Sequence, residues 1–133
     1  MEIEDYEQVY RLWKSTDIII KSSDQKEEIQ RMLKKNPDTC LVGIENSKII
    51  SVVLGGFDGR RGYVHHLAVK PEKQGQGLGK AMMDELMNRF EDLKVIKVHL
   101  FVEENNKEVK DFYRNIGFKE RTDLTDFSKA LIE

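Results

Sequence analysis

Apolar side chains recur at helical spacing in four parts of the 133-residue chain. Near its start, Tyr6, Val9 and Trp13 share one face, and the acidic residues before them favour a helix N-terminus. A second helix is predicted from Asp24, because Glu27 three residues later completes a capping box. Two later helices are predicted from the apolar rows Leu78–Met82–Leu86–Phe90 and Val109–Phe112–Tyr113–Ile116.

Short apolar runs between the first helices predict strands. Residues 39–45 and 48–57 predict a hairpin with a tight polar turn between its strands. Two glycines inside the second run, Gly55 and Gly56, predict a bulge or a bend at that point. Residues 63–69 predict a third strand, which ends just before a proline.

The second half of the chain predicts further strands. Residues 95–102 are almost continuously apolar, which indicates a central strand. Residues 118–121 and 127–133 predict a final strand pair around the polar turn 122–126. Helices that alternate with strands in this way indicate an α/β or α+β domain with a mixed sheet, and the simplest organisation is one domain over residues 1–133.

Composition narrows the classes of function. The 22 basic and 24 acidic residues give a net charge of −2, without the positive field that nucleic acid attracts. The single cysteine, Cys40, excludes an internal disulfide and fits a reducing compartment. No run reaches the roughly 20 apolar residues of a membrane span, and the acidic start MEIEDYEQ does not match a signal peptide. We therefore expect a cytoplasmic domain that binds neither nucleic acid nor membrane.

The stretch QGQGLGK, residues 74–80, brings three glycines straight into the third predicted helix. Glycine loses the most conformational freedom on folding, so this sequence indicates a function, and an anion bound by backbone N–H groups is the leading candidate. A Walker A loop is excluded, since Gln74 replaces its first glycine and Ala81 replaces its hydroxyl residue. A Rossmann fingerprint is excluded too, since it requires glycine at the position of Lys80.

The same stretch resembles the acyl-CoA loop of the GNAT superfamily of N-acetyltransferases. That loop reads Arg or Gln, any two residues, Gly, any residue, then Gly or Ala, which Gln74, Gly77 and Gly79 match. The preceding strand and Pro71 also resemble the family. Among its branches, the YpeA-like bacterial acetyltransferases are the most similar, particularly over residues 59–83.

A second motif lies downstream in the correct order. NNKEVKDFYRNIGF, residues 105–118, resembles the family signature N-x-x-small-x-x-F-Y-x-x-x-G-F, with Val109 where alanine is usual. Two motifs in this order strengthen the resemblance. The matching residues are Asn106, Phe112, Tyr113, Gly117 and Phe118.

The resemblance implies a GNAT fold, in which a mixed, mostly antiparallel and splayed sheet of about six or seven strands is flanked by about four helices. Relatives open with a short edge strand before the first helix. Here the chain enters that helix almost directly after Met1, so the first edge strand is missing or reduced to a residue or two.

The resemblance also implies acetyl transfer from acetyl-CoA to an amine, with no metal. The pyrophosphate is expected on the N–H groups from Gly75 to Lys80, and the pantetheine amides on the main chain of Leu67 and Val69, within the gap of the splayed sheet. The predicted cofactor-binding residues are Leu67, Ala68, Val69, Gln74, Gly75, Gln76, Gly77, Leu78, Gly79, Lys80, Asn106 and Phe112.

In this family the amine attacks the thioester directly, so the site needs a base and an acid. Relatives sometimes place a glutamate or histidine at positions equivalent to Tyr63 or His65, which makes His65 the predicted base, acting through a water; an ordinary strand histidine is the alternative. Strand alternation places His66 on the opposite face. Tyr113 is the predicted acid for the departing thiolate, with a core aromatic as the alternative, and Phe101 occupies the position where many relatives carry a base glutamate.

Other interpretations stay open beside the enzyme. A CoA-binding module with little catalysis fits the short N-terminus and the missing carboxylate base. A nucleic-acid or protein adaptor is suggested only by GRRG at residues 59–62, which forms a solvated turn more simply. Asn106 caps the last helix, or binds the cofactor if Asn105 takes the cap. The amine acceptor is undefined, and a homodimer is an open question because family members often form one.

Overall fold

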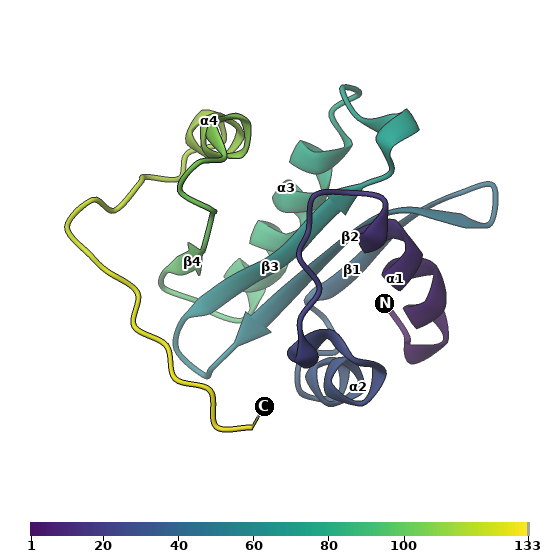
Figure 1. Cartoon of the computed structure of the whole chain (residues 1–133), viewed down its shortest axis with the longest axis horizontal. Helices are drawn as coiled ribbons and strands as arrows, with labels where there is room; N and C mark the ends of the chain where they lie inside the picture. Colours follow the sequence, from purple (N-terminus) through teal and green to yellow (C-terminus); the bar gives the residue numbers. More distant parts are fainter. Residues whose placement is uncertain (133) are drawn as a thin grey trace. The chain divides into compact units, whose positions relative to one another are not determined.

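The protein is described by a computed structural model that covers residues 1–132. The chain divides into two compact units, Met1–Leu100 and Phe101–Glu133, and each is described by itself. The helices and strands of the first unit (Figure 1) are α1 (Tyr6–Lys14), α2 (Lys26–Lys35), β1 (Cys40–Glu45), β2 (Lys48–Phe57), β3 (Gly62–Val69), α3 (Leu78–Asp92) and β4 (Val98–Leu100).

The four strands form one mixed sheet in the order β1-β2-β3-β4. The β1–β2 and β2–β3 pairs are antiparallel, whereas β3 and β4 are parallel. The predicted hairpin is confirmed, and its turn places Asn46 at φ 51° and Ser47 at φ 64°. Two consecutive residues with positive φ give the turn the twist that a tight hairpin requires.

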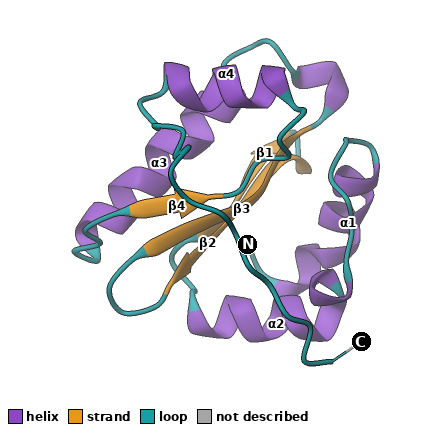
Figure 2. Ribbon diagram, turned by 60° about the vertical axis from the view of Figure 1, so that its left-hand side comes forward, coloured by secondary structure: helices purple, strands orange, loops and turns teal. Residues whose placement is uncertain are grey.

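Helices cover both faces of this sheet: α1 and α2 lie on one side and α3 on the other (Figure 2). The α1–α2 side holds the main core, with Val9, Trp13 and Val52 fully buried. On the other side, Leu86 and Phe90 of α3 are buried against the sheet. The apolar faces predicted for these helices are therefore the faces that they bury.

Glycines in β2 and β3 permit the close approach of α3. A Cβ at Gly55 would lie 2.6 Å from the Thr39 carbonyl oxygen and 2.7 Å from Leu86 Cδ1. Of the bulge or bend predicted at Gly55 and Gly56, the bulge does not form, because both residues keep regular pairing with β3. The irregularity of the β2–β3 ladder falls instead between Val52 and Leu54 of β2.

The start of α2 also differs from the prediction. The helix begins at Lys26 with Gln25 at the N-cap, so Asp24 does not cap it and the box with Glu27 does not form. Asp24 closes a short 3-10 turn, Ser22–Asp24, and its carboxylate accepts a hydrogen bond from the Lys21 N–H at 2.9 Å. A carboxylate can accept a hydrogen bond from an N–H in a nearby turn as readily as from one at a helix N-terminus. Here the Asp24 carboxylate accepts the turn N–H and so does not cap α2.

In the second unit, α4 (Lys107–Asn115) is capped at both ends. Asn106 Oδ1 accepts a hydrogen bond from the Val109 N–H at 3.2 Å. Gly117 has φ 100° and its N–H bonds the Arg114 carbonyl, while the Phe118 N–H bonds the Tyr113 carbonyl at 2.9 Å. This is a Schellman motif, which confirms the predicted glycine stop.

The sheet is smaller than the six or seven strands expected. The predicted strand at 95–102 shortens to β4, and its predicted central place is wrong, because β4 stands at the end of the strand order. Residues 118–121 and 127–132 form no strand, and Glu133 lies outside the described residues. Between residues 119 and 129 only Leu124 and Phe127 are apolar, and they are 59% and 92% exposed. Such a segment buries little apolar surface to offset the entropy of ordering it. No strand precedes α1 in the described residues, where Ile3–Asp5 form a 3-10 turn.

Candidate functional site

The glycine loop leads from β3 into α3 and has a backbone that favours glycine. After the 3-10 turn Pro71–Lys73, Gly75 has φ 80° and Gly77, the N-cap of α3, has φ 83°. A Cβ at either position would meet nothing within 4 Å. Space is therefore not the constraint at these positions. The constraint is the left-handed backbone conformation, because it strains any residue with a Cβ.

This conformation leaves a row of backbone donors at the helix N-terminus. The first hydrogen bond of α3 runs from the Ala81 N–H to the Gly77 carbonyl at 3.0 Å. Within residues 1–132, the N–H groups from Gly75 to Lys80 have no protein partner. The loop is mostly exposed. Unpaired N–H groups and the positive end of a 15-residue helix together favour an anion.

Two side chains of the loop already have partners. Gln74 Nε2 donates to the Val69 carbonyl at 3.0 Å and so ties the loop to the end of β3. Lys80 Nζ lies 2.8 Å from Asp84 Oδ2, one turn along α3, and both side chains are more than half exposed. Gln74 therefore fixes the loop, and the charge of Lys80 is shared with Asp84.

Within the first unit, the part of the β3 edge next to the loop has no strand partner, and we call it the open edge. Its pairing with β4 consists of Gly62–Val98, Tyr63–His99 and Val64–Leu100, and β3 then continues for five more residues. The N–H of Lys70 bonds the Ile50 carbonyl of β2 at 2.8 Å. Because backbone groups alternate along a strand, Leu67 and Val69 direct theirs to the edge away from β2. That edge can pair with an extended polar ligand.

A bulge in β3 changes which side chains face the α1–α2 side. Leu54 pairs with His65 and Val52 with Ala68, so β3 carries one extra residue, and His66 has φ 51°. His66 contacts the Trp13 ring on α1, with centroids 5.1 Å apart. His65 lines a shallow groove of about 450 Å³ along α2. Both histidines thus face the same helical layer, and the prediction that they lie on opposite faces is wrong.

The groove next to His65 has a mixed lining. Met32, Asn36 and charged residues of α2 line one side, and Phe57 and Tyr63 line the other. Although His65 is exposed, desolvation by its surroundings lowers its pKa, and the neighbouring His66 lowers it further. Neutral imidazole is the form that can accept a proton.

The sequence did not predict that Asp24 joins this region. Its Oδ1 lies 2.9 Å from His66 Nε2, although the two residues are 42 positions apart. Burial acts to raise the pKa of Asp24, but the hydrogen bonds from His66 and the Lys21 N–H outweigh it and hold the pKa below its usual value. No local sequence pattern indicates a contact between residues so far apart. The sequence indicates only that an acidic residue precedes α2.

The second unit holds the other predicted residues. Tyr113 packs edge-on against Phe112 and Phe118, with ring centroids 5.1 and 5.6 Å away. Burial raises the pKa of its hydroxyl to about 12. Asn106 uses its carbonyl oxygen as the cap of α4, so the alternative in which Asn105 takes the cap is wrong.

Residues 1–132 hold no cluster of three or more His, Cys, Asp or Glu side chains placed to bind a metal ion. None of the helices in this range has the length and apolar character that crossing a membrane requires.

Comparison with known proteins places this geometry in a family. The model of the Acetyltransferase (GNAT) family matches residues 6–118. An acetyltransferase of Pectobacterium atrosepticum is 34% identical over 130 residues, which cover 98% of this chain and 92% of the relative.

Two solved structures share the fold. Ard1 from Thermoplasma volcanium superposes with a TM-score of 0.81 at 21% identity, over 90% of this chain and 79% of its own. The PaiA N-acetyltransferase from Thermoplasma acidophilum, in complex with coenzyme A, gives a TM-score of 0.77 at 18% identity, over 90% and 86% of the two chains. The chain therefore belongs to the GNAT family of acetyltransferases.

Proposed function

We propose that this protein transfers an acetyl group from acetyl-CoA to a primary amine by direct attack on the thioester. The observation that carries the proposal is the row of unpaired N–H groups from Gly75 to Lys80 beside the open edge of β3. We further propose that residues 1–133 act as one acetyltransferase domain, since the family match at 6–118 runs through both compact units.

The loop and the strand edge fit the two polar parts of acetyl-CoA. The N–H groups of the loop would hold the pyrophosphate, and the exposed Gln76 borders them. The backbone of Leu67 and the N–H of Val69 would pair with the pantetheine amides as an added strand does, while the Val69 carbonyl already accepts a hydrogen bond from Gln74. Ala68 is buried in the core and pairs with Val52, so it contributes by holding this edge rather than by touching the ligand.

His65 is the proposed base. An alkyl ammonium has a pKa of about 10 and must lose a proton before it attacks. The lowered pKa of His65 keeps the ring neutral at pH 7, and the groove on which it lies gives an amine access from solvent. We propose that His65 accepts the proton through a water.

Tyr113 is the proposed partner of the leaving thiolate. A raised pKa of about 12 keeps its hydroxyl protonated over the whole working range of an enzyme. Complete proton transfer to a thiolate with a pKa of about 8.5 is uphill, so donation of a hydrogen bond is the larger contribution. Phe112 and Phe118 hold the ring in place for this role.

A CoA-binding module with little catalysis is the second candidate. It is favoured by Phe101, which is 69% exposed at the position where many relatives carry the base glutamate. The experiment that tests both is a panel of amines with acetyl-CoA, followed by release of free CoA. The panel should include polyamines, aminoglycosides, amino acids and peptides with free N-termini or lysines.

Turnover of at least one amine supports the enzyme. Binding of acetyl-CoA without any turnover supports the module, and failure to bind acetyl-CoA contradicts both. A cytoplasmic location is part of the proposal, in keeping with the buried, free thiol of Cys40.

A further inference from the structure

His66 has a backbone conformation that a residue with a side chain seldom adopts. Its φ of 51° lies in the left-handed region, within a strand, at the bulge of β3. Histidine tolerates this region better than branched residues, but the conformation still costs energy relative to the extended one. Such a conformation persists only where the surroundings hold it.

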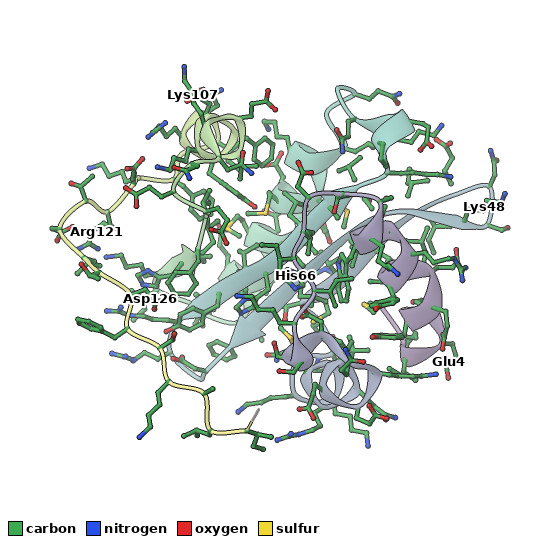
Figure 3. The ribbon with its side chains drawn as sticks, viewed as in Figure 1. Glu4, Lys48, His66, Lys107, Arg121 and Asp126 are labelled. Carbon is green, nitrogen blue, oxygen red and sulfur yellow. The ribbon has the colours of Figure 1, made fainter. Side chains whose placement is uncertain are left out.

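The surroundings hold His66 through its ring. His66 Nε2 lies 2.9 Å from Asp24 Oδ1, and the carboxylate is only 8% exposed. Asp24 Oδ2 accepts the Lys21 N–H at 2.9 Å, so both carboxylate oxygens have partners. The Trp13 ring meets the imidazole edge-on at 5.1 Å. Figure 3 labels His66 over the middle of the sheet.

The backbone of Asp24 is itself held from α1. Tyr6 Oη donates to the Asp24 carbonyl at 2.7 Å, and Tyr6 is buried in the same core as Trp13. The segment between α1 and α2 is therefore tied to α1 at one point and to β3 at another. A buried, fully hydrogen-bonded carboxylate of this kind specifies one geometry.

The bulge lies where the chemistry is proposed. It follows the last β3–β4 pair, Val64–Leu100, and it separates His65 from Leu67. If residue 66 relaxed to an extended conformation, regular alternation would turn the side chains on one side of it to the opposite face. Either His65 would leave the groove or Leu67 would leave the open edge.

We propose that Asp24 and His66 form a positioning pair, which holds residue 66 in its left-handed conformation and so orients His65 and the open edge of β3 together. The inference rests on the proposed function for its catalytic consequence, though not for the conformation itself. Neither residue is a catalytic residue in this account, because both act through the backbone of the bulge.

Glycine provides the test, because it adopts positive φ without support. In Asp24→Ala the pair is lost and the acetyl-CoA Kd, measured by calorimetry, is expected to rise by about tenfold, the effect of one lost hydrogen bond to the ligand. The double variant Asp24→Ala/His66→Gly is expected to recover to within roughly threefold of the wild type. A pair with a merely structural role would show no such recovery, so a double variant no better than the single one overturns the proposal.

A second comparison needs no change at Asp24. His66→Gly and His66→Ala both remove the ring, but only glycine keeps the bulge at no cost. We expect His66→Gly to bind acetyl-CoA about tenfold more tightly than His66→Ala, and equal affinities would overturn the proposal. Glu7→Gln is the matched control, since it breaks an ion pair of 3.0 Å between α1 and α2 that does not touch β3, and it should leave the Kd unchanged.

The conformation can be tested without any ligand. The amide–Hα coupling constant of residue 66 in the free protein should report positive φ in the wild type and in Asp24→Ala/His66→Gly. It should shift toward the extended value in Asp24→Ala; an unchanged coupling there overturns the proposal. If the wild type shows the expected coupling but does not bind acetyl-CoA, the proposed function fails and the pairing inference stands.

Discussion

Replacing Gly77 by alanine separates the contribution of the glycine loop to stability from its proposed contribution to ligand binding. The residue is the N-cap of α3, with φ 83° and ψ 9°, and an added Cβ would meet nothing within 4 Å. The substitution therefore introduces no clash. Its cost is that of holding an L-residue in the left-handed region, about 1 kcal/mol of unfolding free energy. For a chain of this size that corresponds to a fall in Tm of roughly 3 °C.

The effect on ligand affinity should be larger. If the loop holds a pyrophosphate, the N–H groups after Gly77 point at it only while the loop keeps its conformation, which alanine strains. Loss of one charge-assisted hydrogen bond costs roughly 2 kcal/mol, which raises the acetyl-CoA Kd by about thirtyfold. Calorimetric titration of the wild type and Gly77→Ala measures this ratio directly.

Gly59 supplies the matched control. It has φ 95° in the turn between β2 and β3, and a Cβ there also meets nothing within 4 Å. Gly59→Ala should lose the same stability as Gly77→Ala and keep the wild-type Kd. If both variants lose stability equally and both keep the wild-type Kd, the loop does not hold the phosphates and the reasoning is refuted.

Three further predictions concern single side chains. Gly55→Ala should destabilise the fold by about 2 kcal/mol in chemical denaturation, because its Cβ would lie 2.6 Å from the Thr39 carbonyl oxygen and 2.7 Å from Leu86 Cδ1 of α3; an unchanged midpoint would contradict the close packing of α3. Tyr113→Phe should lower kcat by about 100-fold and leave the acetyl-CoA Kd unchanged, whereas an equal loss of both would make Tyr113 structural. Because the pKa of His65 is lowered, kcat/KM should rise with pH along a limb centred below the ordinary histidine value of about 6.5, where His65 loses its proton. That limb should vanish in His65→Gln, and its persistence there would exclude His65 as the base.

Local motifs could be predicted from the sequence because they report local backbone geometry. Gly77 and Gly117 have positive φ at the start of α3 and the end of α4, where the glycine patterns placed them. The buried faces of the helices could be predicted too, since the spacing of apolar residues along a helix reflects which face is buried. The family motifs combined both signals, which is why the loop and α4 lie where the sequence predicted.

The bulge at His66 could not be predicted in this way. From the sequence YVHHLAV, the only applicable rule is that successive side chains of a strand point to opposite faces. A single residue in the left-handed conformation breaks this alternation. The contact that accompanies this conformation comes from Asp24, 42 positions earlier, whose local sequence favoured a helix cap. Tertiary contacts of this range have no local signal, and they decided which face His65 and His66 share.

Calorimetric titration of the wild-type protein with acetyl-CoA tests most directly whether this chain binds the proposed donor, and the same titration of Gly77→Ala tests whether the Gly75–Lys80 loop holds it. Saturable binding at one site per chain is expected, with a rise in Tm that grows as ligand exceeds Kd; at a hundredfold excess the added stability is about 2.7 kcal/mol. No heat of binding and an unchanged Tm at millimolar acetyl-CoA would contradict the account.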